Sequence, residues 1–80
     1  MTHSHVGDLL RDRLSLLLGI PASEIRDDSR FEDLGVDSLM LLELVAVVEQ
    51  AIRRQLVEED IGSLGSIADV RHYVAALEAA

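Results

Sequence analysis

The chain is organised around the stretch Phe31-Glu-Asp-Leu-Gly-Val-Asp-Ser-Leu39, where an acidic turn ends and a long apolar run begins. Gly35 permits the backbone conformations that a tight turn needs. Asp37 or Ser38 can accept a hydrogen bond from the free backbone amides of a helix that follows. This pattern predicts a serine hydroxyl at a helix start, where the positive end of the helix dipole favours a phosphate ester on that oxygen. We therefore interpret Ser38 as an attachment point rather than a catalyst.

The apolar run predicts a helix from Ser38 or Leu39 to about Gln55, because no Pro or Gly interrupts it. Its inner face is expected to consist of Leu41, Leu44, Val45, Val48 and Ile52, which recur at helical spacing. Other apolar residues spread around the same helix, so part of its apolar surface lies outside that face. Packing against another helix is one explanation, and a surface for a protein partner is the other.

Three further helical segments are predicted around this one. Apolar residues recur at helical spacing from about His5 to Leu18, and Gly19 with Pro21 is expected to stop that helix. Between residues 56 and 65 the periodicity is weak and a glycine interrupts it, which indicates a short or irregular helix. The last helix is expected to begin after Ser66 as its cap.

Residues 19–37 form a loop that is long for so small a domain. Its apolar residues are expected to reach the core: Ile20, Ile25, Phe31 and Leu34. Its acidic residues are expected to remain in water: Glu24, Asp27, Asp28, Glu32, Asp33 and Asp37. An EF-hand calcium loop is the first alternative, but no window has the alternating oxygen ligands, central glycine and final glutamate that such a loop needs. We reject that alternative.

The composition predicts one small helical domain. The chain has 80 residues, of which 49% are apolar, and Phe31 and Tyr73 are its aromatic residues. A core of mostly Leu, Val, Ala and Ile indicates packed helices. We therefore predict an all-α fold, a small four-helix bundle with three main helices, a short third helix and a long loop between helices one and two. Residues 1–80 are expected to form this single small domain.

The charge narrows the classes of partner. The formal net charge is −8, from fifteen acidic residues against seven basic ones, so binding to nucleic acid or an anionic membrane is disfavoured and basic protein partners are favoured. The chain has no cysteine, so any thiol must come from a cofactor. No apolar run is long enough to span a bilayer, and the first five residues do not resemble a signal peptide. These features predict a cytoplasmic monomer.

Enzymatic and metal-binding alternatives lack the residues they need. The segment from Gly35 to Met40 does not have the Gly-x-Ser-x-Gly spacing of a serine hydrolase, and no glycine-rich phosphate loop is present. His3 and His5 have no third ligand nearby, so we interpret them as part of a solvated tail rather than a metal site. His72 is expected to be an exposed helix residue. We predict neither a catalytic residue nor a metal site.

The stretch from Ile25 to Leu39 resembles the signature of acyl carrier proteins. The match includes Ile25, Phe31, Leu34, Gly35 and then Asp37-Ser38-Leu39 in unbroken register. The resemblance implies that a magnesium-dependent phosphopantetheinyl transferase moves 4′-phosphopantetheine from coenzyme A to Ser38. It also implies that Asp37 helps to position the metal of that transferase, and that the thiol of the arm holds an acyl group as a thioester.

The resemblance also implies a partner surface on the helix after Ser38, with an apolar centre and carboxylates around it. In this chain the surface would consist of Leu39, Met40, Leu42, Glu43, Ala46 and Glu49. Met40 departs from the family, since many fatty-acid carriers have an acidic residue at that place. The expected partners are the phosphopantetheinyl transferase, an acyl- or aminoacyl-loading enzyme, and synthase or transferase enzymes with basic docking surfaces.

Three functions stay open at this point. The Asp37-Ser38-Leu39 context favours a discrete acyl carrier of fatty-acid or polyketide synthesis, and Met1 just before the first helix favours a stand-alone protein. The apolar Met40 gives slight support to a free-standing aminoacyl or peptidyl carrier. The alternative from a different class is an unmodified helical adaptor that binds partners through the helix after Ser38, with Ser38 as a plain helix cap.

Overall fold

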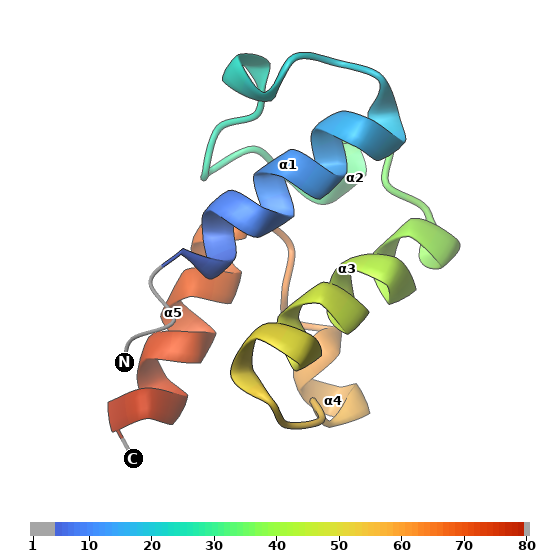
Figure 1. The fold of residues 1–80 in the computed structure, drawn as a ribbon. Helices are drawn as coiled ribbons and strands as arrows, with labels where there is room; N and C mark the ends of the chain where they lie inside the picture. Colours follow the sequence, from blue (N-terminus) through green and yellow to red (C-terminus); the bar gives the residue numbers. More distant parts are fainter. Residues whose placement is uncertain (1–4, 80) are drawn as a thin grey trace.

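The computed structural model describes residues 5–79, and this part of the chain is helical without strands. Its elements are α1 (Val6–Leu18), the 3₁₀ turn η1 (Ala22–Glu24), α2 (Phe31–Leu34), α3 (Ser38–Ile52), α4 (Glu58–Ile61) and α5 (Ile67–Ala79). α1 packs against both α3 and α5, and the short α4 follows α3 (Figure 1). The predicted all-α bundle is confirmed, with its three main helices and the short helix α4. The described residues also contain a second short helix, α2, in the segment that was predicted to be a loop.

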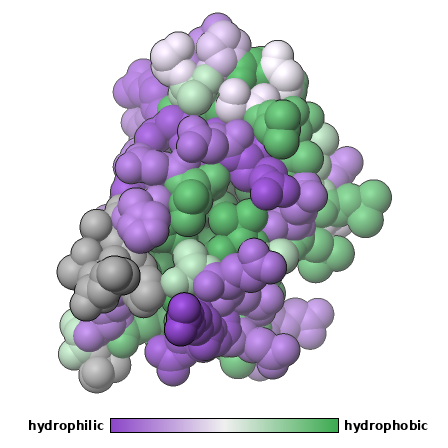
Figure 2. Space-filling model, viewed as in Figure 1, coloured by the Kyte–Doolittle hydropathy of each residue, from purple (hydrophilic) through white to green (hydrophobic). Residues whose placement is uncertain are grey.

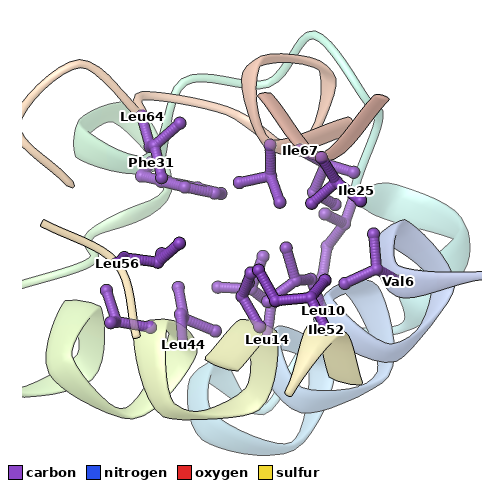
Figure 3. Packing of buried hydrophobic residues seen from close by; sticks show 14 residues of the cluster. Val6, Leu10, Leu14, Ile25, Phe31, Leu44, Ile52, Leu56, Leu64 and Ile67 are labelled. Atoms are coloured by element: carbon purple, nitrogen blue, oxygen red, sulfur yellow. The ribbon is translucent and has the colours of Figure 1, made fainter. Parts of the chain in front are cut away.

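The main helices share one hydrophobic core, to which each contributes an apolar stripe. The buried side chains of α1 are Val6, Leu10 and Leu14, and those of α5 are Ile67, Val70 and Val74. On α3 the predicted inner face is confirmed, with Leu44, Val45, Val48 and Ile52 buried and Leu41 half-buried. Figure 3 shows side chains of these helices converging on one centre, together with Phe31 of α2 and Leu56 from the segment after α3.

The long loop is attached to this core as predicted. Its apolar anchors are buried or half-buried against the core: Ile20, Ile25, Phe31 and Leu34. Two backbone hydrogen bonds join the loop to the region where α5 begins, from Phe31 N to Gly65 O at 2.8 Å and from Ala68 N to Asp27 O at 2.9 Å. The loop that leads to Ser38 is therefore fixed at its middle and near its end.

One acidic residue of the loop is paired with arginines of the main helices. Asp27 is half-buried between Arg11 of α1 and Arg71 of α5, which both donate hydrogen bonds to its carboxylate, Arg71 Nε at 2.7 Å. Arg11 Nε also donates to the carbonyl oxygen of Ile25 at 2.9 Å. The hydrogen bond from Arg71, together with the positive charges of both arginines, holds the pKa of Asp27 below its ordinary value of 3.8. Asp27 is therefore solvated only in part, with 42% of its side chain exposed, because two helices present arginines to it.

α3 ends earlier than predicted, at Ile52 rather than near Gln55. Arg53 adopts a left-handed conformation with φ 58° and ψ 41°, which ends the helix. The Oε2 atom of Glu49 accepts a hydrogen bond from Leu56 N at 2.9 Å across this end. Leu56 can then turn into the core, where 8% of its surface is exposed.

The cap of α5 is the predicted one. Asp69 N donates to Ser66 Oγ at 3.1 Å, and Asp69 Oδ2 accepts from Gly65 N at 2.8 Å. The short helix expected between residues 56 and 65 is the single turn α4. Its Asp60 accepts a hydrogen bond of 2.8 Å from the Tyr73 hydroxyl, and this bond raises the pKa of Tyr73 above its ordinary value. The contact joins α4 to α5.

Across residues 5–79, no helix combines the length and the apolar character needed to cross a membrane. The same residues contain no group of three His, Asp or Glu side chains that could hold a metal ion. His3, one half of the His-x-His pair considered above, lies outside the described residues. His72 is exposed on α5, as predicted.

Leu10 provides a test of the packing of α1. Its side chain is fully buried, so Leu10→Ala should lower the free energy of unfolding by about 2–5 kcal/mol through the cavity that it leaves. Leu16 on the same helix is 76% exposed, and Leu16→Ala should change stability by less than about 0.5 kcal/mol. Urea unfolding followed by circular dichroism measures both. Equal losses would show that the buried face of α1 is assigned incorrectly.

Asp27 provides a test of the pairing between helices. Because folding lowers its pKa, its ionised form stabilises the folded state above the unfolded pKa, and this stabilisation is lost as the pH falls through the folded-state pKa. Asp27→Asn should therefore reduce stability at neutral pH, and its difference from the wild type should shrink as the pH falls below 3.8. Asp28→Asn is the control, since the Asp28 side chain is 73% exposed and should matter little. Urea unfolding curves at several pH values measure the difference in unfolding free energy between the two proteins. A difference that stays the same at every pH would contradict this prediction.

Candidate functional site

The turn before Ser38 is built by α2. Phe31 is buried at the start of α2, and Val36 N donates to the Phe31 carbonyl oxygen at 3.0 Å. Gly35 ends the helix with φ 92°, a left-handed conformation that favours glycine. The chain is then extended at Asp37, with φ −97° and ψ −177°, and enters α3. The predicted tight turn is confirmed, and it delivers the serine directly to a helix start.

Asp37, rather than Ser38, caps α3. Its Oδ1 atom accepts a hydrogen bond from Met40 N at 2.9 Å, and its carbonyl oxygen accepts the first helical hydrogen bond from Leu41 N at 2.9 Å. Ser38 is the first residue of the helix and is exposed. Since the acid makes the cap, the serine hydroxyl is not needed for it and is accessible from solvent.

A groove of about 230 Å³ opens beside Ser38, between α2, the start of α3 and the segment before α5. Its apolar lining comes from Phe31, Val36, Leu41 and Leu64. Arg30 is the one basic residue in its lining, beside the acidic Glu32 and Asp37. The groove therefore offers apolar surface beside Ser38, with one basic and two acidic residues in its lining.

Arg30 lies across the backbone at Gly65. Its Nη1 atom is 3.6 Å from Asp69 Oδ2, and a side chain at residue 65 would collide with its guanidinium group. Glycine at this place therefore makes room for the arginine. Arg30 carries no signal in the sequence, because nothing in the acidic loop shows that a glycine far along the chain lies against it.

The interior beyond the groove is closely packed. A cavity of about 10 Å³, no larger than a water molecule, lies among apolar side chains of α1, α3 and α5. Phe31, Leu41 and Leu64 line both this cavity and the groove, so these side chains separate the groove from the core. In this conformation that cavity is too small for a long chain.

The residues of the predicted partner surface lie mainly on the outward side of α3. Leu39 and Leu42 are 78% and 62% exposed, and Glu43 and Ala46 are exposed as well. Figure 2 shows hydrophobic groups gathered where α1 ends and α3 begins, on the right of the view. An exposed apolar area of this kind is typical of a surface that meets a partner.

Two residues of the predicted partner surface are less exposed to a partner than the others. Met40 and Glu49 are half-buried at the edges of the exposed face. The carboxylate of Glu49 accepts the hydrogen bond from Leu56 N, so it helps to hold the connection after α3. Partner binding by the six predicted residues stays a prediction.

Comparison with known proteins agrees with this geometry. Residues 8–74 match the family model for the phosphopantetheine attachment site. The acyl carrier protein of Clostridium acetobutylicum is 35% identical over 77 residues, which cover 95% of each chain. The acyl carrier protein of Chlamydia caviae is 40% identical over 58 residues, which are 71% of this chain and 75% of that protein.

A third relative is much larger. The chain is 34% identical over 64 residues, or 80% of its length, to the non-reducing polyketide synthase rads2 of Floropilus chiversii, of which the match covers 3%. The family model and the acyl carrier proteins together cover nearly all of the chain. The chain therefore belongs to the acyl carrier protein family, whose members are carriers built around a phosphopantetheine attachment site and not enzymes.

Proposed function

We propose that this protein is a discrete acyl carrier that holds acyl intermediates as thioesters on a 4′-phosphopantetheine arm at Ser38. It moves them between enzymes of a polyketide, fatty-acid or related biosynthetic pathway. The observation that carries the proposal is the exposed Ser38 hydroxyl at the first residue of a 15-residue helix whose cap is supplied by Asp37. Similarity to the acyl carrier protein of Clostridium acetobutylicum supports a carrier of this size, and the synthase match supports a polyketide pathway.

The residues around Ser38 fit this prosthetic group. A phosphodiester on Ser38 Oγ would lie at the N-terminus of α3, where unpaired N–H groups and the helix dipole favour negative charge. Arg30 adds a positive charge to the groove, and the apolar lining of the groove suits the aliphatic part of the arm. When bound, the group supplies the thiol that a chain without cysteine lacks.

Attachment requires one nucleophile from this chain. Ser38 Oγ attacks the phosphorus atom of coenzyme A that bears pantetheine, and the phosphoanhydride bond breaks. Adenosine 3′,5′-bisphosphate leaves with the electrons of that bond, and the serine proton passes to a base of the phosphopantetheinyl transferase. Asp37 uses Oδ1 for the helix cap, and we assign its other carboxylate oxygen to positioning the Mg²⁺ of the transferase.

The outward face of α3 is the proposed docking surface for the enzymes that use the carrier. Its apolar centre consists of Leu39, Met40, Leu42 and Ala46. Its carboxylates are Glu43 and Glu49, which suits the transferase, a loading enzyme and synthases with basic surfaces. The net charge of −8 speeds encounter with such enzymes and disfavours nucleic acid and anionic membranes. We infer that the carrier works as a cytoplasmic monomer.

Modification of Ser38 tests the proposed function. Incubation with coenzyme A, Mg²⁺ and a broad-specificity phosphopantetheinyl transferase should add one phosphopantetheine per chain, as measured by intact-protein mass. Ser38→Ala should take up none, whereas Ser23→Ala, which removes another exposed serine hydroxyl, should be modified like the wild type. Addition to Ser38→Ala would refute the assignment. An unmodified wild type, with a transferase that modifies other carriers, would favour the adaptor function.

Two substitutions of Asp37 separate its two proposed roles. Asp37→Asn keeps an oxygen for the helix cap, so the free energy of unfolding should stay near that of the wild type. The variant lacks the charge that orients the metal, so kcat/KM for modification should fall roughly 10- to 100-fold. Asp37→Ala should in addition lower the free energy of unfolding by about 0.5–2 kcal/mol. Urea unfolding and transferase kinetics measure the two effects. Wild-type kinetics for Asp37→Asn would remove the metal role.

A further inference from the structure

The edge between α1 and α3 carries an ion pair that the proposed function does not use. The Nη1 atom of Arg13 on α1 lies 3.5 Å from Oε1 of Glu43 on α3, and the two side chains are 41% and 44% exposed. Glu43 is also a carboxylate of the proposed docking surface. The acid that would meet a basic enzyme is therefore already paired with an arginine of its own chain.

The surroundings of this pair are mostly apolar. On α1, Leu9 and Leu16 lie four residues before and three residues after Arg13, so all three share one side of the helix. On α3, Met40 lies three residues before Glu43 and Val47 lies four residues after it, and both are half-buried. The two helices pack side by side and run in opposite directions (Figure 1). Because both side chains are more than two-fifths exposed, the pair is a weak one that a charge of a partner can replace.

Two other carboxylates near Ser38 each use one oxygen to hold the backbone of the fold. Asp37 accepts the cap hydrogen bond from Met40 N, and Glu49 accepts from Leu56 N at the end of α3. A partner that drew either carboxylate away would uncover backbone N–H groups of the fold. Glu43 is different, because its contact is with a flexible side chain that can swing away into water.

We propose that Arg13 restrains docking by holding Glu43 until an arginine or lysine of a partner enzyme replaces it. This inference rests on the proposed carrier function. Arg13 acts through Glu43 and is a positioning residue. Because the chemistry at Ser38 is unchanged, a substitution of Arg13 should change KM and not kcat.

The test measures KM and kcat of a phosphopantetheinyl transferase for the apo protein at low ionic strength. Arg13→Gln should lower KM about two- to fivefold, the range expected for the loss of one exposed ion pair, with kcat unchanged. Arg13→Lys keeps the charge and should behave like the wild type. Arg26→Gln is the matched control, because it makes the same change of net charge and breaks an exposed pair with Asp28 of 3.3 Å.

A second background shows whether Glu43 transmits the effect. In Glu43→Gln, the further change Arg13→Gln should leave KM unaltered. The proposal is overturned if Arg13→Gln lowers KM equally in both backgrounds, if Arg26→Gln lowers it as much, or if Arg13→Gln has no effect.

Titration calorimetry of each apo variant against the transferase makes the test independent of catalysis. Tighter binding of Arg13→Gln supports the proposal, and unchanged binding overturns it. A failure of the carrier function itself would appear separately, as a wild type that receives no phosphopantetheine.

Discussion

The burial of Phe31 is the constraint on which the position of the functional serine depends. Its side chain is 5% exposed in the helical core, and its backbone N–H group donates to Gly65 O. Its carbonyl oxygen accepts from Val36 N, which closes the turn. The left-handed conformation of Gly35 then directs the chain into α3. Few torsions remain free between the core and Ser38, so a small domain can present a single hydroxyl at a constant place.

The sequence predicts the parts of the fold that depend on local spacing. The main helices and the loop anchors follow from apolar periodicity and from helix stop signals. The end of α3 does not follow from local spacing. It depends on a left-handed Arg53, a conformation that is uncommon for residues other than glycine and that no local pattern indicates. The pairing of Asp27 does not follow from local spacing either, since Arg11 and Arg71 lie 16 and 44 residues away in sequence and meet it only in the folded chain.

The candidate site shows the same division. Ser38 and the turn before it are readable from the motif, because adjacent residues perform each function. The position of Arg30 cannot be predicted from the motif, because it depends on the distant Gly65 that makes room for it. The hydrogen bond of Glu49 at the end of α3 also escaped prediction, although the residue was expected at the partner surface. A carboxylate near the serine can therefore support the fold and a partner surface at once.

Peptide mapping of the modified protein tests the central claim, attachment at Ser38, most directly. Trypsin cleaves after arginine, so it releases residues 31–53 as one peptide in which Ser38 is the one side chain with a hydroxyl group. After incubation with coenzyme A, Mg²⁺ and a phosphopantetheinyl transferase, we predict the added mass of one phosphopantetheine on this peptide and none elsewhere. An unmodified peptide 31–53, or the added mass on another peptide, would contradict the assignment of Ser38.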